Sequence, residues 1–213
     1  MKIKKLGHCC FIAEIDGKRV MTDPGSYSTL QNEETGVDLV VITHEHPDHL
    51  HIDSLKQVLA NNKNAKIVTN TAVGKLLDEA GIPYEVLEEG QEGNYAGVHL
   101  EGYGNRHEEI YEDFGQVQNT GYFIGPNLFY PGDAFTNPNK KVDILALPIA
   151  GPWMKIKSAI TYGLELKPRI CFPIHDGMIQ EDKPGPIYRL PPNIFSKNNI
   201  EFKKLELGIE EDL

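Results

Sequence analysis

The chain has 213 residues, of which 40% are hydrophobic and 24% are charged, and this composition excludes disorder along the chain as a whole. Its net charge of −10 repels polyanions and disfavours nucleic acid as a partner. The longest apolar run, residues 144–153, is much shorter than the roughly 18 residues that span a bilayer, so no membrane partner is expected.

Cysteine is scarce in this chain. Cys9 and Cys10 are adjacent, Cys171 is distant, and no CxxC spacing occurs. Three thiols without a paired framework fit a reducing compartment and argue against a disulfide scaffold or a thiolate zinc site. The first residues also lack a secretory signal, so we expect a cytoplasmic protein with one domain over residues 1–213.

Strand and helix signals alternate along the chain, which predicts an α/β protein with helices outside its sheets. Asp16 and Gly17 form a turn dipeptide between residues 4–15 and 18–22, and this pattern predicts a hairpin. The apolar, β-branched run at residues 37–43 predicts a strand that is buried on both faces.

Further elements follow along the chain. The sequence predicts helices over residues 52–61 and 156–166, with another between them that Thr71 caps and Gly81 ends. The other predicted strands are residues 65–69, 98–104, 121–124, 128–130, 142–147 and 169–174. Residues 177–193 contain four prolines and predict a long surface loop, before a last strand near residues 200–204.

Four of the eight histidines lie within eight residues, in the segment THEHPDHLH that follows the run at residues 37–43. His44 and His46 are two apart on leaving a strand, so their side chains fall on the same side. Asp48 and His49 lie where the chain turns toward a helix and can point back into the same pocket. Imidazole and carboxylate are ligands that Zn²⁺ accepts, so this spacing favours a metal site over a solvated, histidine-rich loop.

Three further candidate ligands occupy equivalent places. His107, Asp133 and His175 each follow a predicted apolar strand, where α/β sheets collect their ligands. With the four earlier side chains they make two sites of three ligands each, which share Asp133. Each site keeps an open position, as catalysis requires.

Five segments, in order, carry a family resemblance: GHCCF, MTDPG, THEHPDH, FYPGDAF and PIHDG. Over roughly residues 6–177 the chain resembles hydrolases of the metallo-β-lactamase superfamily. It is most similar to the branch that includes ascorbate-phosphate-lactonase-like proteins and many uncharacterised hydrolases. The resemblance implies a four-layered αββα sandwich.

The resemblance also implies which side chains hold each metal. It implies a first metal on His44, His46 and His107, a second on Asp48, His49 and His175, and a bridge at Asp133. Asp133 stands where common zinc β-lactamases have cysteine, which disfavours β-lactamase activity. His46 stands where diiron, oxygen-reducing relatives have glutamate, which disfavours redox chemistry.

These observations predict a binuclear metal-dependent hydrolase that uses a metal-bridging hydroxide, oriented by Asp48, to cleave a lactone, ester or amide. The substrate would be a small molecule, with an anionic or phosphorylated one favoured by the charge of the metals. Zinc is the expected metal, with manganese and iron as alternatives. A nuclease or phosphodiesterase with the same metal pair stays open, as do a metal-binding protein without turnover and a homo-oligomer.

Four other residues are candidates for supporting a ligand or contacting the substrate. Asp23 would accept the second N–H of a metal-binding imidazole or serve only as a turn residue. His8 and Trp153 would line the pocket or be structural. If residues 177–193 wall the pocket rather than simply connect strands, Tyr188 and Arg189 would reach inward, and Arg189 would bind an anion.

Overall fold

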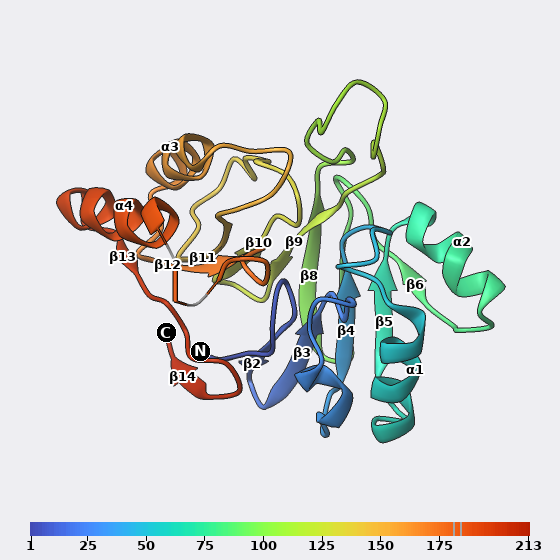
Figure 1. Cartoon of the computed structure of the whole chain (residues 1–213). Helices are drawn as coiled ribbons and strands as arrows, with labels where there is room; N and C mark the ends of the chain where they lie inside the picture. The colour runs from blue at the N-terminus through green and yellow to red at the C-terminus, as the bar shows by residue number, and fades with distance from the viewer. Residues whose placement is uncertain (181, 184) are drawn as a thin grey trace.

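The computed structural model describes residues 1–180, 182–183 and 185–213, and in these residues two sheets pack face to face with helices on both outer sides (Figure 1). The first sheet has the order β14 (Glu210–Asp212), β1 (Lys2–Lys5), β2 (Phe11–Ile15), β3 (Lys18–Thr22), β4 (Leu39–Ile42), β5 (Lys66–Thr69) and β6 (Glu85–Val86). The second has the order β13 (Glu201–Phe202), β12 (Ile170–Ile174), β11 (Ile144–Pro148), β10 (Leu128–Tyr130), β9 (Gly121–Ile124), β8 (Val98–Tyr103) and β7 (Glu92–Tyr95).

Helices cover the outer face of each sheet. On the first sheet lie α1 (Ile52–Asn61) and α2 (Thr71–Glu79), and on the second lie α3 (Ile156–Leu166) and α4 (Gly185–Phe195), as Figure 1 shows. Short 3₁₀ turns occur at Leu30–Glu33 and Ser196–Asn198. One apolar core fills the space between the sheets, and two others lie beneath the helices. The predicted four-layered αββα sandwich is therefore confirmed.

Three of the strands that lead to candidate ligands are buried on both faces. Every residue of β4, β10 and β12 is buried, in agreement with their apolar sequences. In the first sheet β3, β4 and β5 run parallel, and in the second β10, β11 and β12 do so. Parallel strands end on the same edge of a sheet, so the residues that follow them lie together.

The predicted hairpin joins β2 to β3, which pair antiparallel with Ile15 opposite Lys18. Asp16 and Gly17 have φ values of 49° and 75°, the left-handed pair that a tight two-residue hairpin turn requires.

Replacing Gly17 with alanine is expected to lower the free energy of unfolding by about 1 kcal/mol. No atom lies within 4 Å of the position a Cβ would take, so the cost comes from the backbone conformation alone. Urea unfolding measures this effect. Asp16→Asn is the matched control and should change little, because asparagine tolerates a positive φ. An alanine variant as stable as the parent would contradict this account of the turn.

Two sequence predictions about local structure are wrong. The cap of α2 is Asn70, whose side chain accepts a hydrogen bond from the Val73 amide, while Thr71 is already the first helical residue. Asparagine and threonine both suit an N-cap, so the sequence does not distinguish these two adjacent positions. In the structure the first of them, Asn70, is the cap.

The loop predicted over residues 177–193 is wrong in its second half, where α4 begins at Gly185. Pro186 falls in the first turn, where its missing N–H costs nothing, but Pro191 and Pro192 lie inside the helix. The face of α4 with Pro191 and Phe195 is buried against the second sheet and α3. Burial of this apolar face offsets the helix-breaking cost of the prolines.

Across the described part of the chain, every helix is too short, or too polar, to traverse a lipid bilayer.

Candidate metal centre

The predicted ligands come together where strands of both sheets end. His44 follows β4 in the first sheet, while Asp133 and His175 follow β10 and β12 in the second. A cavity of about 360 Å³ lies at this place, and the candidate ligands that line it are His46, Asp48, His107, Asp133 and His175.

Three histidines form one compact group. The ligand nitrogens of His44, His46 and His107 all lie within 4.8 Å of one another. The side chains of His44 and His107 are buried, and that of His46 is partly exposed to the cavity.

Carboxylates and two more histidines form a second group beside the first. Asp133 Oδ2 lies 2.8 Å from His175 Nε2 and 3.3 Å from His107 Nε2, and Asp133 Oδ1 lies 3.2 Å from His49 Nε2. Asp48 Oδ2 lies 3.5 Å from His175 Nε2 and 3.8 Å from His49 Nε2. Asp133 thus contacts histidines of both groups. Two ligands of one zinc ion lie roughly 3.3 Å apart, because each is about 2 Å from the metal.

Hydrogen bonds fix the orientation of three of these imidazoles. The Nδ1 atom of His107 lies 2.5 Å from the carbonyl of Glu108, which can only accept, so this nitrogen carries the proton. His49 Nδ1 lies 2.6 Å from Asp23 Oδ2, and His44 Nδ1 lies 3.0 Å from Thr43 Oγ1. The Thr43 hydroxyl donates to Asp23, so it accepts from His44 Nδ1, and His44 and His107 each keep a bare Nε2 lone pair. His49 turns its Nε2 toward Asp133 Oδ1.

The inward atoms lack the partners that burial normally demands. Within the described residues, Nε2 of His44, His49 and His107 and Oδ1 of Asp133 are buried without a hydrogen bond. Each such group costs about 1–3 kcal/mol if nothing satisfies it. Neutral imidazoles and carboxylates are the donor set of Zn²⁺, Mn²⁺ and Fe²⁺, so these residues fit divalent cations.

Electrostatics in the cavity favour a cation. Burial would raise the pKa of Asp133, yet the neighbouring His49 and His175 hold it well below its ordinary value. Burial would lower the pKa of His49, but Asp133 holds it well above the ordinary value. Burial lowers the pKa of His44 well below its ordinary value, so that ring is neutral. The centre thus combines an ionised carboxylate with an imidazole that has a free lone pair.

Comparison with known proteins decides the family. A model described as the beta-lactamase superfamily domain matches residues 2–175. The chain belongs to this superfamily. It is 32% identical to protein Rv0786c of Mycobacterium tuberculosis over 88% of this chain and 90% of that one. It is 27% identical to a UPF0173 metal-dependent hydrolase of Thermoplasma acidophilum, over 82% and 83% of the two chains.

The fold is shared with Igni18, a metallo hydrolase of the archaeon Ignicoccus hospitalis. The TM-score is 0.73 at 20% identity, over 100% of this chain and 98% of the other. The match to the family model confirms the predicted superfamily, and the relatives named as metal-dependent hydrolases confirm the predicted enzyme class.

Asp23 lies behind the cavity, at the end of β3. Its fully buried carboxylate accepts hydrogen bonds from the Thr43 amide (2.8 Å), the Thr43 hydroxyl (2.6 Å) and the Tyr130 hydroxyl, besides His49 Nδ1. This is the placement expected for a residue that orients a ligand. Thr43 and Tyr130 were not singled out from the sequence, because each looks like an ordinary strand residue.

His8 has the opposite orientation from the other rings. The Gly177 amide donates to His8 Nδ1 at 3.0 Å, so the proton of the neutral ring is on Nε2, 3.2 Å from Asp48 Oδ2. His8 Nε2 has no lone pair to offer a metal in this arrangement. The side chain is fully buried beside the cavity.

Trp153 lines the cavity, and its indole N–H donates to Asp133 Oδ2 at 2.9 Å. Arg189, which was expected to reach inward, does not. It lies exposed on α4, and its Nε donates to the Gly185 carbonyl of the same helix. Successive helical residues point about 100° apart, so Tyr188 faces inward, where its hydroxyl donates to Asp176, and Arg189 faces outward.

Proposed function

We propose that this hydrolase holds two divalent metal ions and cleaves a lactone, ester or amide bond in a small anionic molecule. The observation that carries the proposal is the set of buried Nε2 atoms without hydrogen bonds, in rings that hydrogen bonds on Nδ1 hold in place within one cluster of histidines. Histidines that bind metals nearly always have their second nitrogen anchored in this way.

The proposed ligand sets follow the two groups in the cavity. His44, His46 and His107 would hold one ion, Asp48, His49 and His175 would hold the other, and Asp133 would bridge them. We propose zinc first, with manganese and iron as alternatives. Divalent ions would supply a nucleophile from water at neutral pH, since they lower the pKa of water from 15.7 to about 7.

Asp48 is the candidate for orienting the attacking water. Burial would raise its pKa, but the hydrogen bond from His8 and the neighbouring His49 lower the pKa to about 2, so the carboxylate is ionised at neutral pH. Its side chain is 20% exposed and lines the cavity, and it can therefore accept a hydrogen bond from water. Trp153 excludes solvent from the Asp133 side.

The shape of the cavity and its charge support a small anionic substrate. Three exposed apolar side chains, Tyr27, Phe114 and Met178, stand along the cavity and offer a surface for the carbon skeleton. Two divalent ions outweigh the charges of Asp48 and Asp133, so the centre attracts anions, while the net charge of −10 repels long polyanions.

The state of the three cysteines relates to the cellular compartment in which the protein works. Cys9, Cys10 and Cys171 are free thiols, and all three are buried. This supports the proposal that the protein works in the reducing cytoplasm.

The purified protein is expected to saturate at two metal ions per chain, because seven candidate ligands exceed what one tetrahedral ion can use. Elemental analysis after reconstitution measures the ratio. His107→Gln should lower it below two. His51→Gln is the matched control and should not, because His51 is exposed and its Nδ1 is paired with the Ser54 hydroxyl. Saturation of the parent protein at one ion would overturn the binuclear proposal.

The reaction class needs a substrate panel on the reconstituted enzyme, with lactones, carboxylic esters, amides and phosphodiesters of similar size. Turnover of a lactone, ester or amide that depends on added metal supports the proposal. Activity confined to phosphodiesters, or to nucleic acid, would contradict it.

A further inference from the structure

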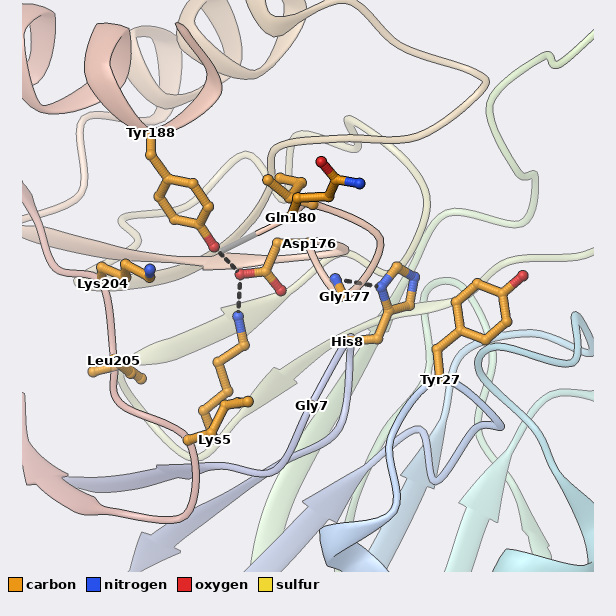
Figure 2. Close-up of a pocket in the computed structure, with 12 residues that line it drawn as sticks. Lys5, Gly7, His8, Tyr27, Asp176, Gly177, Gln180, Tyr188, Lys204 and Leu205 are labelled. Atoms are coloured by element: carbon orange, nitrogen blue, oxygen red, sulfur yellow. Dashed lines mark hydrogen bonds and ion pairs between the residues drawn. The ribbon is translucent and has the colours of Figure 1, made fainter. Parts of the chain in front are cut away.

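A second cavity, of about 190 Å³, lies beside the metal centre, and Figure 2 shows it with Tyr27 at the right. Segments far apart in the sequence build it: the β1–β2 connection, the residues after β12, α4 and the segment after β13. Its volume exceeds the 150 Å³ or so that holds a benzene ring, so a small polar group with a few carbons fits.

The two cavities adjoin at two side chains. Tyr27 lines both of them, and its ring lies 5.3 Å from that of His8, centroid to centroid. His8 lines the second cavity and approaches Asp48 of the first within 3.2 Å. A molecule of modest length around Tyr27 can therefore occupy both cavities.

One carboxylate in the second cavity is already neutralised. Asp176 Oδ2 accepts from Lys5 Nζ at 2.5 Å and from the Tyr188 hydroxyl (Figure 2). Lys5 also donates to the Pro173 carbonyl at 2.7 Å. Lys5 is buried, with its side chain 4% exposed. This ion pair forms the inner wall and leaves no net charge there.

Lys204 supplies the excess charge. Its ammonium group lies 4.7 Å from the centre of the Tyr188 ring, and no carboxylate of the described residues forms an ion pair with it. His8 adds no charge, because its Nδ1 accepts a hydrogen bond and the ring is neutral. Among the described residues that line the second cavity, the charges therefore sum to one positive charge, in a protein whose net charge is −10.

We propose that the second cavity is a specificity subsite that binds an anionic oxygen group of the substrate, a carboxylate or a phosphate. The scissile bond of the same substrate would lie in the first cavity, at the metal centre. This inference rests on the proposed function. Lys204 attracts the anion from the rim, the amide of Gln180 offers it a hydrogen bond, and Leu205 and Leu207 contact the carbon chain.

Kinetics with two matched esters tests the subsite. Para-nitrophenyl acetate is neutral, and mono-para-nitrophenyl succinate carries a carboxylate on the same kind of acyl group. Lys204→Gln is expected to raise KM for the succinate ester about tenfold, because the carboxylate loses one charged partner, and to leave kcat for that ester unchanged. Neither constant should change for the acetate ester. Lys204→Arg keeps the charge and should restore the parent KM.

Lys203→Gln is the matched control, with the same change of charge one residue away. Lys203 is engaged outside the cavity, with Glu211 Oε2 at 3.1 Å and the Asp212 carbonyl at 3.1 Å. It should alter neither ester. Equal effects of Lys204→Gln on both esters, or no effect on either, would overturn the subsite.

A binding measurement separates this proposal from the proposed function. Acetate and inorganic phosphate are titrated into metal-loaded protein carrying ¹³C-labelled tyrosine, with Tyr188→Phe identifying the Tyr188 signal. The signal is expected to shift with at least one anion, more weakly in Lys204→Gln, and the tighter anion identifies carboxylate or phosphate. No shift with either anion, in an enzyme that hydrolyses the panel, would overturn the subsite alone. A shift without any hydrolysis would overturn the proposed function and leave the subsite.

Discussion

Replacement of Asp133 with alanine is expected to abolish hydrolysis and to weaken the binding of both metal ions. One carboxylate contacts histidines of both groups, with Oδ2 toward His107 and His175 and Oδ1 toward His49. Without it, two divalent cations would lie close together with less negative charge between them, and they repel strongly at short range. Elemental analysis and turnover of the best substrate measure the two effects.

Asp133→Asn is the informative companion to this variant. It keeps the shape of the side chain and an oxygen that can accept the Trp153 indole N–H, but it removes the charge. The metal-free asparagine variant should therefore fold like the parent by circular dichroism and still lose metal affinity. If the alanine variant retained two metals and near-normal turnover, Asp133 would not be the bridge.

Replacement of Asp23 with alanine is expected to lower the free energy of unfolding by about 3–5 kcal/mol. The change strands four buried donors at once: His49 Nδ1, the Thr43 amide, the Thr43 hydroxyl and the Tyr130 hydroxyl. Asp23 also has φ of 31°, which alanine tolerates poorly. Denaturant unfolding measures the loss.

Asp23→Asn separates orientation from stability. Asparagine tolerates the positive φ and keeps one acceptor oxygen for part of these donors, so it should lose less stability than alanine does. The imidazole of His49 loses its charged partner, and metal affinity or activity should fall about 10–100-fold. A fall in stability without any change in metal affinity or turnover would show that Asp23 does not orient the ligand.

His44, Asp133 and His175 were accessible from the sequence because each follows a fully buried apolar strand, whereas the strand that leads to His107 is half buried. The β-branched run before His44 is β4, and the apolar runs before Asp133 and His175 are β10 and β12. Parallel strands end on one edge, so order along the chain translated into proximity in space. The partners of the imidazoles were less accessible, because the Glu108 carbonyl that anchors His107 is backbone and leaves no sequence signal.

The elements that the sequence did not predict lack a signal in their own residues. The edge strands β6, β7 and β14 are short and mostly exposed, so they lack the apolar pattern by which a strand is recognised. The prolines of α4 indicated a loop, and the apolar face that keeps the helix folded depends on a sheet far away in sequence. The inward direction assigned to Arg189 failed with the loop, since side-chain direction in a helix follows its register.

The metal centre also affects how firmly the two sheets are held together, because its candidate ligands come from opposite sheets. His44, His46, Asp48 and His49 follow a strand of the first sheet, and His107, Asp133 and His175 follow strands of the second. Each proposed ion therefore cross-links the two sheets. Its binding free energy then adds to the stability of the whole fold. Removing the metal with a chelator would therefore speed the hydrogen exchange of amides in both sheets together, rather than in one loop.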